Sequence, residues 1–455
     1  MSTVDAATRS DRQAAEPPAG QTVPVRWSPL TRIVFRFCFV YFGLFCLLFA
    51  QIVFAFLGYV VTLLPDDAML WQMRTITPVV EWLGRTVFDT EVVLRTDSGS
   101  GDQAFIWTLV FGILVVSVLA TLVWTVLDRR RTEYRVLAGW FLIFLRLCLA
   151  GQMLFYGVAK LIPSQMPEPA LQALLQPFGE FSLTSVLWLQ VGSSPAYEIL
   201  LGAAEVLGGV LLFLPRTALL GALLSLVAMA QVWVLNMTFD VPVKILSFHL
   251  LLLAVVLLAP EARRLLDALV LDRPTGPSTY PQPFRTPRSR RIAATAQAAL
   301  GVWMTAGLLY MGVDSWYEFG GGKAKPELYG IWEVTEFTVD GTPAPPLTTD
   351  ENRWQRLVVE HEEMVTLQRM DGTLVPTLAT TAENALTLTA PPTAPDASPT
   401  TLGTFTLDRP TPDQLRLDGQ WNGHPVTIAL TQRDLNEFPL RQREFHWIQD
   451  YPNFR

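Results

Sequence analysis

Six residues with ionisable side chains lie within or at the ends of apolar runs of helix length: Arg146, Lys160, Glu205, Asp240, Lys244 and His249. Charged groups at bilayer depth are costly, so they usually face neighbouring helices or a water-filled space and mark functional sites. Lysine and histidine can donate hydrogen bonds to a carbonyl group, and a buried carboxyl can pass protons. These residues are therefore the first candidates for chemistry.

The apolar run 136–162 has one polar side. Arg146, Tyr156 and Lys160 fall on a single helical stripe, because residues three, four or seven apart lie above one another on a helix. Lys160 lies near the end of the run, where its long stem can equally well extend to the lipid head groups. Arg146 lies too deep in the run for that interpretation.

The following run, 197–214, carries two carboxylates on one face, Glu198 and Glu205. At a rise of about 1.5 Å per residue, Arg146 and Glu205 both fall near mid-membrane on neighbouring spans. We therefore predict a buried ion pair between these two residues. Its expected role is mainly structural, because such a pair can simply fix helix packing.

A second polar group gathers where the next two runs, 217–237 and 243–258, are connected. The polar residues at this connection, together with those at the same end of the neighbouring runs, predict a polar mouth of the bundle that faces outward and binds a substrate or a quinone. The candidate binding residues are Lys160, Glu198, Asn236, Asp240, Lys244, His249 and Tyr156. For Asp240 and Lys244 taken alone, a turn that faces the lipid head groups explains the sequence better.

The composition is typical of a membrane protein with a soluble part. Half of the 455 residues are hydrophobic and only 16% are charged. The net charge of -7, without a long basic block, gives no basis for nucleic-acid binding. Cys38, Cys46 and Cys148 all lie in apolar runs, and their spacing provides no disulfide framework, redox pair or zinc site. The expected partner is therefore a lipid bilayer, and no metal site is expected.

Seven apolar runs reach or approach the roughly 20 residues that span a bilayer: 33–64, 104–127, 136–162, 197–214, 217–237, 243–258 and 292–311. The arginine-rich segments before the first run, after the second and after the sixth are expected in the cytoplasm under the positive-inside rule. The N-terminus is therefore expected on the cytoplasmic side of the plasma (inner) membrane, and the C-terminus outside.

From about residue 328, polar and apolar residues alternate between Asp-Gly and Asn-Gly pairs, which predicts antiparallel hairpins. The Gly-Ile-Trp sequence at 330–332 resembles the start of a lipocalin-like barrel, in which the tryptophan closes one end. His361, His424 and His446 are far apart in this region. They are not expected to form a metal site, which needs three or four convergent ligands.

The expected fold class is an all-α membrane protein of about seven transmembrane helices, followed by a small antiparallel β-barrel or sandwich. The expected parts are a disordered cytoplasmic tail (1–30), two membrane helices with an acidic outer loop (31–128), a four-helix membrane core (135–270), a basic proline-rich cytoplasmic linker (271–291), a last membrane helix (292–312) and an extracytoplasmic β-domain (328–455).

The stretch from Arg146 to about Pro260 resembles the DoxX-like family of four-helix membrane proteins. The resemblance rests on a Tyr-Gly-x-x-Lys segment ending at Lys160, a Glu-x-x-Gly-Gly segment beginning at Glu205, and the order Asn-x-x-x-Asp-Val-Pro-Val-Lys…His beginning at Asn236. Named members are associated with sulfur oxidation, as membrane subunits of thiosulfate:quinone oxidoreductase, and with thiol stress. This chain departs from a thiol-exchange pattern because its sequence shows no membrane cysteine pair.

Two functions remain open on this basis. The first is a redox-linked subunit that binds a quinone, or a small thiol or sulfur species, in the polar mouth. A single membrane histidine does not suffice for an unassisted haem, so electrons would come from an added cofactor or a redox partner subunit. The second is a non-catalytic anchor that presents the β-domain to a ligand or protein. A transporter is less favoured, because no inverted repeat is visible.

Overall fold

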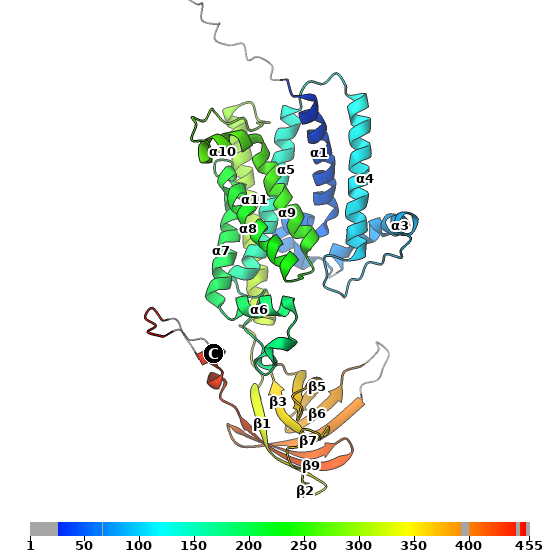
Figure 1. Cartoon of the computed structure of the whole chain (residues 1–455), viewed down its shortest axis with the longest axis vertical. Helices are drawn as coiled ribbons and strands as arrows, with labels where there is room; N and C mark the ends of the chain where they lie inside the picture. The colour runs from blue at the N-terminus through cyan, green and yellow to red at the C-terminus, as the bar shows by residue number, and fades with distance from the viewer. Residues whose placement is uncertain (1–25, 66, 393–399, 443–445, 452–455) are drawn as a thin grey trace, which may run out of the picture.

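A computed structural model describes residues 26–65, 67–392, 400–442 and 446–451. A bundle of long helices forms one part of the molecule and a β-barrel forms the other (Figure 1). In the described part, seven helices are long and apolar enough to cross a membrane: α1 (Pro29–Leu48), α4 (Ala104–Leu127), α5 (Arg135–Leu161), α7 (Pro195–Phe213), α8 (Ala218–Thr238), α9 (Lys244–Leu258, continued by η4, Ala259–Glu261, and α10, Ala262–Leu269) and α11 (Pro287–Glu318). The predicted fold class is confirmed. We call the end of the bundle next to the barrel the barrel side.

The predicted first span, residues 33–64, is not one continuous helix. After α1 the chain continues as a short helix α2 (Ala50–Phe54) and a 3-10 segment η1 (Ala55–Leu63). Gly58 in η1 has a φ of 53°, a conformation that glycine adopts without strain. A Cβ on Gly307 of α11 would lie only 2.4 Å from the Tyr59 nitrogen. The break therefore allows η1 and α11 to pack backbone against backbone.

The acidic segment between the first two spans contains a helix, α3 (Ala68–Phe88), where sequence analysis predicted only a loop. Figure 1 shows α3 lying crosswise to α4 near the barrel side. Its large apolar side chains Trp71, Val79 and Trp82 are exposed. An exposed apolar face on a helix that does not cross the bundle is typical of a helix at the membrane surface.

Helices α5 and α7 pack with their backbones in contact. A Cβ on Gly202 would lie 2.3 Å from the Leu161 nitrogen, and a Cβ on Gly157 would lie 2.7 Å from the Val206 nitrogen. Small residues permit such close approach between membrane helices. This contact places Gly157 directly opposite Val206 and so determines which side chains of the two helices lie at the same depth.

Eight long strands form a closed up-and-down barrel, in which each strand pairs with the next and β1 pairs with β9. They are β1 (Gly330–Val339), β3 (Trp354–Val359), β4 (Met364–Arg369), β5 (Leu374–Ala382), β6 (Ala385–Ala390), β7 (Thr400–Thr411), β8 (Gln414–Trp421) and β9 (His424–Gln432); the short β2 (Thr342–Pro343) pairs with β1. Three aromatic rings pack in the barrel core: Trp354 contacts Phe405 and Trp421 edge to face, and Phe405 and Trp421 are stacked. Trp332 is fully buried, and its indole nitrogen donates to the Leu328 carbonyl at 2.8 Å.

The barrel contacts the bundle through the segment between α5 and α6 (Leu183–Gly192). This segment contains η2 (Leu171–Leu174) and η3 (Phe178–Glu180); η5 (Leu435–Glu437) and α12 (Pro439–Gln442) follow the barrel. Leu171 is fully buried against Ile331 and Val358 of the barrel, and its backbone nitrogen donates to the Glu360 carboxylate at 3.2 Å. The barrel is therefore packed onto the bundle as well as tethered to α11.

Candidate functional site

A cavity of about 190 Å³ lies inside the four-helix group α5, α7, α8 and α9, toward the barrel side. Much of its lining is apolar and includes Leu187, Val191, Met229 and Leu250. Polar groups also enter the lining: Tyr156, Lys160, Glu205, Asn236 and Ser247, with Gln165 and Gln231. An apolar cavity with a few convergent polar groups is typical of a small-molecule site.

The central polar group is an ion pair between Lys160 of α5 and Glu205 of α7. The Lys160 Nζ lies 2.8 Å from the Glu205 Oε2, and the two residues are only 6% and 4% exposed. The Lys160 Nζ also lies 5.6 Å from the centre of the Tyr156 ring. Lys160 therefore turns inward to a carboxylate and does not extend to the head groups.

The predicted pairing of Glu205 with Arg146 is wrong, because the two side chains lie at different depths. Glu205 neighbours Gly157 on the facing helix, and Arg146 lies eleven positions earlier on α5. Eleven residues correspond to roughly 16 Å along a helix. Arg146 instead donates a hydrogen bond from Nη2 to the Oε1 of Gln297 on α11. The position of a residue within an apolar run does not give its depth relative to a neighbouring helix, because the packing of α5 against α7 sets that depth.

Asn236 and Ser247 join α8 to α9 at the cavity wall. The Asn236 Nδ2 donates to the Ser247 Oγ at 3.0 Å. Glu198 is buried but does not line the cavity. Its Oε1 accepts a hydrogen bond from the Met166 backbone nitrogen at 2.9 Å, so Glu198 holds the segment that follows α5 against α7.

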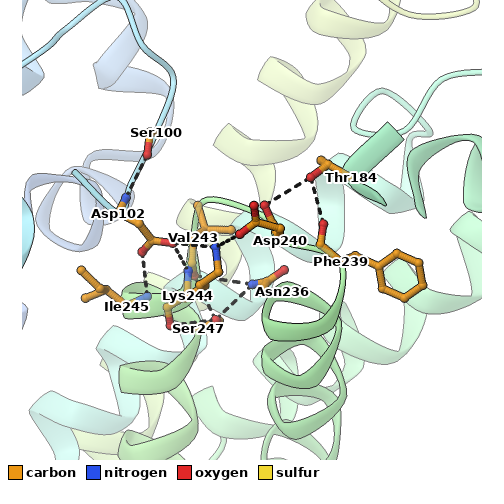
Figure 2. Close-up of polar contacts among 10 residues, drawn as sticks. All are labelled: Ser100, Asp102, Thr184, Asn236, Phe239, Asp240, Val243, Lys244, Ile245 and Ser247. Atoms are coloured by element: carbon orange, nitrogen blue, oxygen red, sulfur yellow. Dashed lines mark hydrogen bonds and ion pairs between the residues drawn. The ribbon is translucent and has the colours of Figure 1, made fainter. Parts of the chain in front are cut away.

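Figure 2 shows Asp240 and Lys244 at the N-terminus of α9, in the same network of polar contacts as Asn236 and Ser247; the Ser247 hydroxyl donates to the Lys244 carbonyl at 3.1 Å. The Lys244 Nζ lies 2.8 Å from the exposed Asp240 carboxylate. Asp102 accepts hydrogen bonds from the backbone nitrogens of Lys244 and Ile245 at 2.7 and 2.9 Å. Asp102, Asp240 and Lys244 do not line the cavity. The sequence offered no local signal for Asp102, because this carboxylate caps a helix more than a hundred residues away.

Replacing Asp102 with alanine is expected to destabilise the protein by about 0.5–2 kcal/mol, the usual cost of losing a side-chain cap on a helix N-terminus. The measurement is thermal unfolding of the purified protein in detergent. Asp97 is exposed in the same loop, so Asp97→Ala is the matched control and should leave the Tm unchanged. Equal Tm values for both variants would contradict a capping role.

His249 faces away from the cavity toward α1. Its Nδ1 is hydrogen-bonded to the Ile245 carbonyl at 2.7 Å and must carry the proton, so the Nε2 accepts from the Tyr41 hydroxyl at 2.8 Å. The imidazole also stacks on Phe45, with ring centres 4.0 Å apart. His249 therefore connects α9 to α1 and does not join the other candidate binding residues.

The sequence predicts a mouth that opens at the outer end of the bundle, whereas the cavity reaches the surface on the side of the bundle. Ala204 of α7 and Val227 and Gln231 of α8 line the cavity and are exposed on the side of the bundle. These residues lie along two membrane-length helices. The opening is therefore lateral, between α7 and α8, at a surface that faces lipid in a membrane.

Two cysteines that are remote in sequence lie together in the structure. Cys46 of α1 and Cys148 of α5 are neighbours in the bundle core, each is 1% exposed, and both are free thiols. The three cysteines are free, so the structure contains no disulfide between them, but it brings two thiols together that sequence spacing did not connect. Spacing rules could not reveal this pair, because it forms only where α1 packs against α5.

Fold and cavity together define a multi-pass membrane protein with a barrel domain and a small-molecule-sized cavity in its helix bundle. The chain is similar to the uncharacterized protein YwoB of Bacillus subtilis (strain 168), with 33% identity over 121 residues; the match covers 26% of this chain and 75% of YwoB. The chain belongs to the same family as YwoB. No family model and no solved structure matches the chain.

Proposed function

We propose that the four-helix group binds a lipid-soluble molecule with a carbonyl-bearing ring, such as a quinone. The observation that carries this proposal is the combination of the buried Lys160–Glu205 pair with a lateral opening between α7 and α8. A quinone dissolved in the bilayer would enter from the side. Its ring would lie against the apolar lining, and its polar end would reach the ion pair.

The polar groups suit a carbonyl oxygen. An ammonium group has three donors and no acceptor; Lys160 directs one donor at Glu205 and another at the Tyr156 carbonyl oxygen. The third donor can be directed at a ligand carbonyl, and Glu205 lies close enough to relay a proton. We propose further that a redox partner subunit supplies the two electrons that, with two protons, convert a bound quinone to the quinol. This proposal accords with the resemblance to DoxX-like proteins.

Filling the cavity is expected to remove the bound quinone while leaving the ion pair intact. Ala228 lines the cavity on α8, so Ala228→Phe should reduce the quinone that co-purifies with the protein at least tenfold, as quantified by mass spectrometry. Val234, on the same helix, is 51% exposed and lies outside the cavity. The control Val234→Phe should retain the wild-type amount. Equal quinone in both variants, or none with the wild type, would overturn the proposal.

The packed barrel favours a second candidate function, a membrane anchor that positions the barrel domain for a ligand or protein. Its support is the contact of Leu171 with the barrel, which holds the barrel at a defined place on the bundle. This function predicts that cavity-filling variants leave the protein's biological role unaffected. The quinone measurement and a growth or activity readout on the same variants therefore separate the two functions.

We also propose that the barrel lies outside the plasma membrane and the N-terminus in the cytoplasm. The support is the arginine-rich sequence between α4 and α5 and around the start of α11, at the end of the bundle remote from the barrel (Figure 1). Alkaline phosphatase fused after Arg455 should be active, and the same enzyme fused after Asp128 should be inactive. The reverse pattern would overturn this orientation.

A further inference from the structure

A second cavity, of about 980 Å³, lies at the end of the bundle remote from the barrel. Its walls come from α5, α8, α9 and α11 and from the chain that precedes α11. Five arginines line it: Arg146 of α5, Arg216 between α7 and α8, Arg264 of α10, and Arg290 and Arg291 of α11. One carboxylate, Glu261, lines it with them. The positive charge in this cavity therefore greatly exceeds the negative charge.

The Glu261 carboxylate is already engaged. It is 2% exposed, accepts a hydrogen bond from the Ser278 hydroxyl at 2.6 Å, and pairs with the Arg264 Nη1 at 3.0 Å. Its charge is therefore balanced by Arg264. Among the described residues that line the cavity, no other carboxylate is present to balance the remaining four arginines.

Arg146 is the buried member of the set and is 5% exposed. Its Nη2 donates to Gln297, a neutral side chain, and its buried Nε has no hydrogen-bond partner among the described residues. Tyr280 lies nearby, but burial raises the pKa of its hydroxyl to about 12, so Tyr280 is neutral at physiological pH. A buried guanidinium group without a counter-charge is costly, and this one faces a cavity large enough to admit an anion.

We propose that this cavity binds a phosphate-bearing anion, with the phosphate held between Arg146 and the arginines at the rim. The planar guanidinium group matches phosphate geometry through paired N–H donors. A phosphate offers several acceptor oxygens, which suits donors that converge from separate helices. The apolar wall, which includes Ile143, Leu219 and Leu257, suits the organic part of the ligand. An anionic phospholipid and a water-soluble phosphate compound share this chemistry.

The rim arginines provide a test that does not disturb the core. Arg290 and Arg291 are exposed and line the cavity, whereas Arg285 and Arg288 are exposed in the same segment and do not. The double variants Arg290→Gln/Arg291→Gln and Arg285→Gln/Arg288→Gln therefore remove equal charge. Binding of phosphatidylglycerol and phosphatidylcholine to the full-length protein in detergent is measured by native mass spectrometry. Binding of inorganic phosphate is measured by calorimetry.

We expect phosphatidylglycerol or inorganic phosphate to bind the rim variant, Arg290→Gln/Arg291→Gln, at least about tenfold more weakly than the control variant, Arg285→Gln/Arg288→Gln. A tenfold change in Kd corresponds to about 1.4 kcal/mol of binding free energy. Preference for phosphatidylglycerol over phosphatidylcholine without phosphate binding identifies a lipid ligand, and phosphate binding identifies a soluble one. Arg146→Gln should also abolish the rise in Tm that the ligand produces. Equal binding of both lipids without phosphate binding, or equal affinity in the rim and control variants, would overturn the proposal.

Discussion

Glu205→Gln is expected to destabilise the helix bundle by about 3–5 kcal/mol, the range observed when one partner of a buried ion pair is removed. The substitution leaves the Lys160 ammonium charged, 6% exposed and without its carboxylate. The cost arises from that unpaired charge more than from the lost attraction. The measurement is denaturant or thermal unfolding of the purified protein in a fixed detergent, together with the amount of protein that accumulates in the membrane.

The double variant Lys160→Met/Glu205→Met provides the decisive comparison. Because it removes both charges, it should be more stable than Glu205→Gln and should approach the wild type. The exposed pair of Glu81 and Arg85 on α3, with 3.9 Å between charged atoms, provides a control, since exposed pairs contribute about 0–1 kcal/mol. A Glu205→Gln protein as stable as the wild type would show that the ion pair does not maintain the fold.

This comparison also bears on the proposed function. If the double variant folds like the wild type but loses its bound quinone, the pair serves ligand binding. If the double variant is stable and retains the quinone, the apolar lining alone accounts for binding. The stability and ligand measurements on one set of variants therefore separate a packing role from a binding role.

Gly202→Ala is expected to destabilise the protein by about 1–3 kcal/mol, the cost of overpacking a tightly packed core. The added Cβ would lie 2.3 Å from the Leu161 nitrogen and 2.7 Å from the Gly157 carbonyl oxygen. Both atoms belong to the backbone of α5, so relief requires the two helices to separate. Separation would also lengthen the distance between Lys160 and Glu205. The measurement is the Tm of the purified protein.

Gly208 on the same helix provides the matched control. A Cβ there would lie 3.2 Å from the Ser225 hydroxyl, a side-chain atom that can rotate away. Because alanine is favoured over glycine within a helix by about 1 kcal/mol, Gly208→Ala should be neutral or stabilising. A Tm for Gly202→Ala as high as that of Gly208→Ala would contradict the close contact of α5 and α7.

The two cavities differ in their position in the bundle and in the charge of their lining. The smaller one lies toward the barrel side, has a neutralised ion pair and opens laterally. The larger one lies at the remote end and contains arginines whose charge the described chain does not balance. We therefore expect the smaller cavity to accept an uncharged, lipid-soluble molecule and the larger one to accept an anion.

The amino-acid sequence by itself determined that this is a membrane protein with a β-domain, because both features depend on local patterns of polar and apolar residues. Apolar runs of sufficient length indicated the seven membrane-length helices, and period-two alternation with Asp-Gly and Asn-Gly turns indicated the antiparallel β-domain. The sequence also indicated that Tyr156, Lys160, Glu205 and Asn236 are unusual for their surroundings, and the structure places all four at one cavity.

Only the tertiary structure decided which of these groups meet. The partner of Glu205 depends on the register between α5 and α7, which the contacts of Gly157 and Gly202 establish. His249 points to Tyr41, and Cys46 meets Cys148, because α1 packs against the four-helix group. A sequence specifies the side of a helix on which a residue lies, but the distance between two helices and their relative depth arise from packing across the whole bundle.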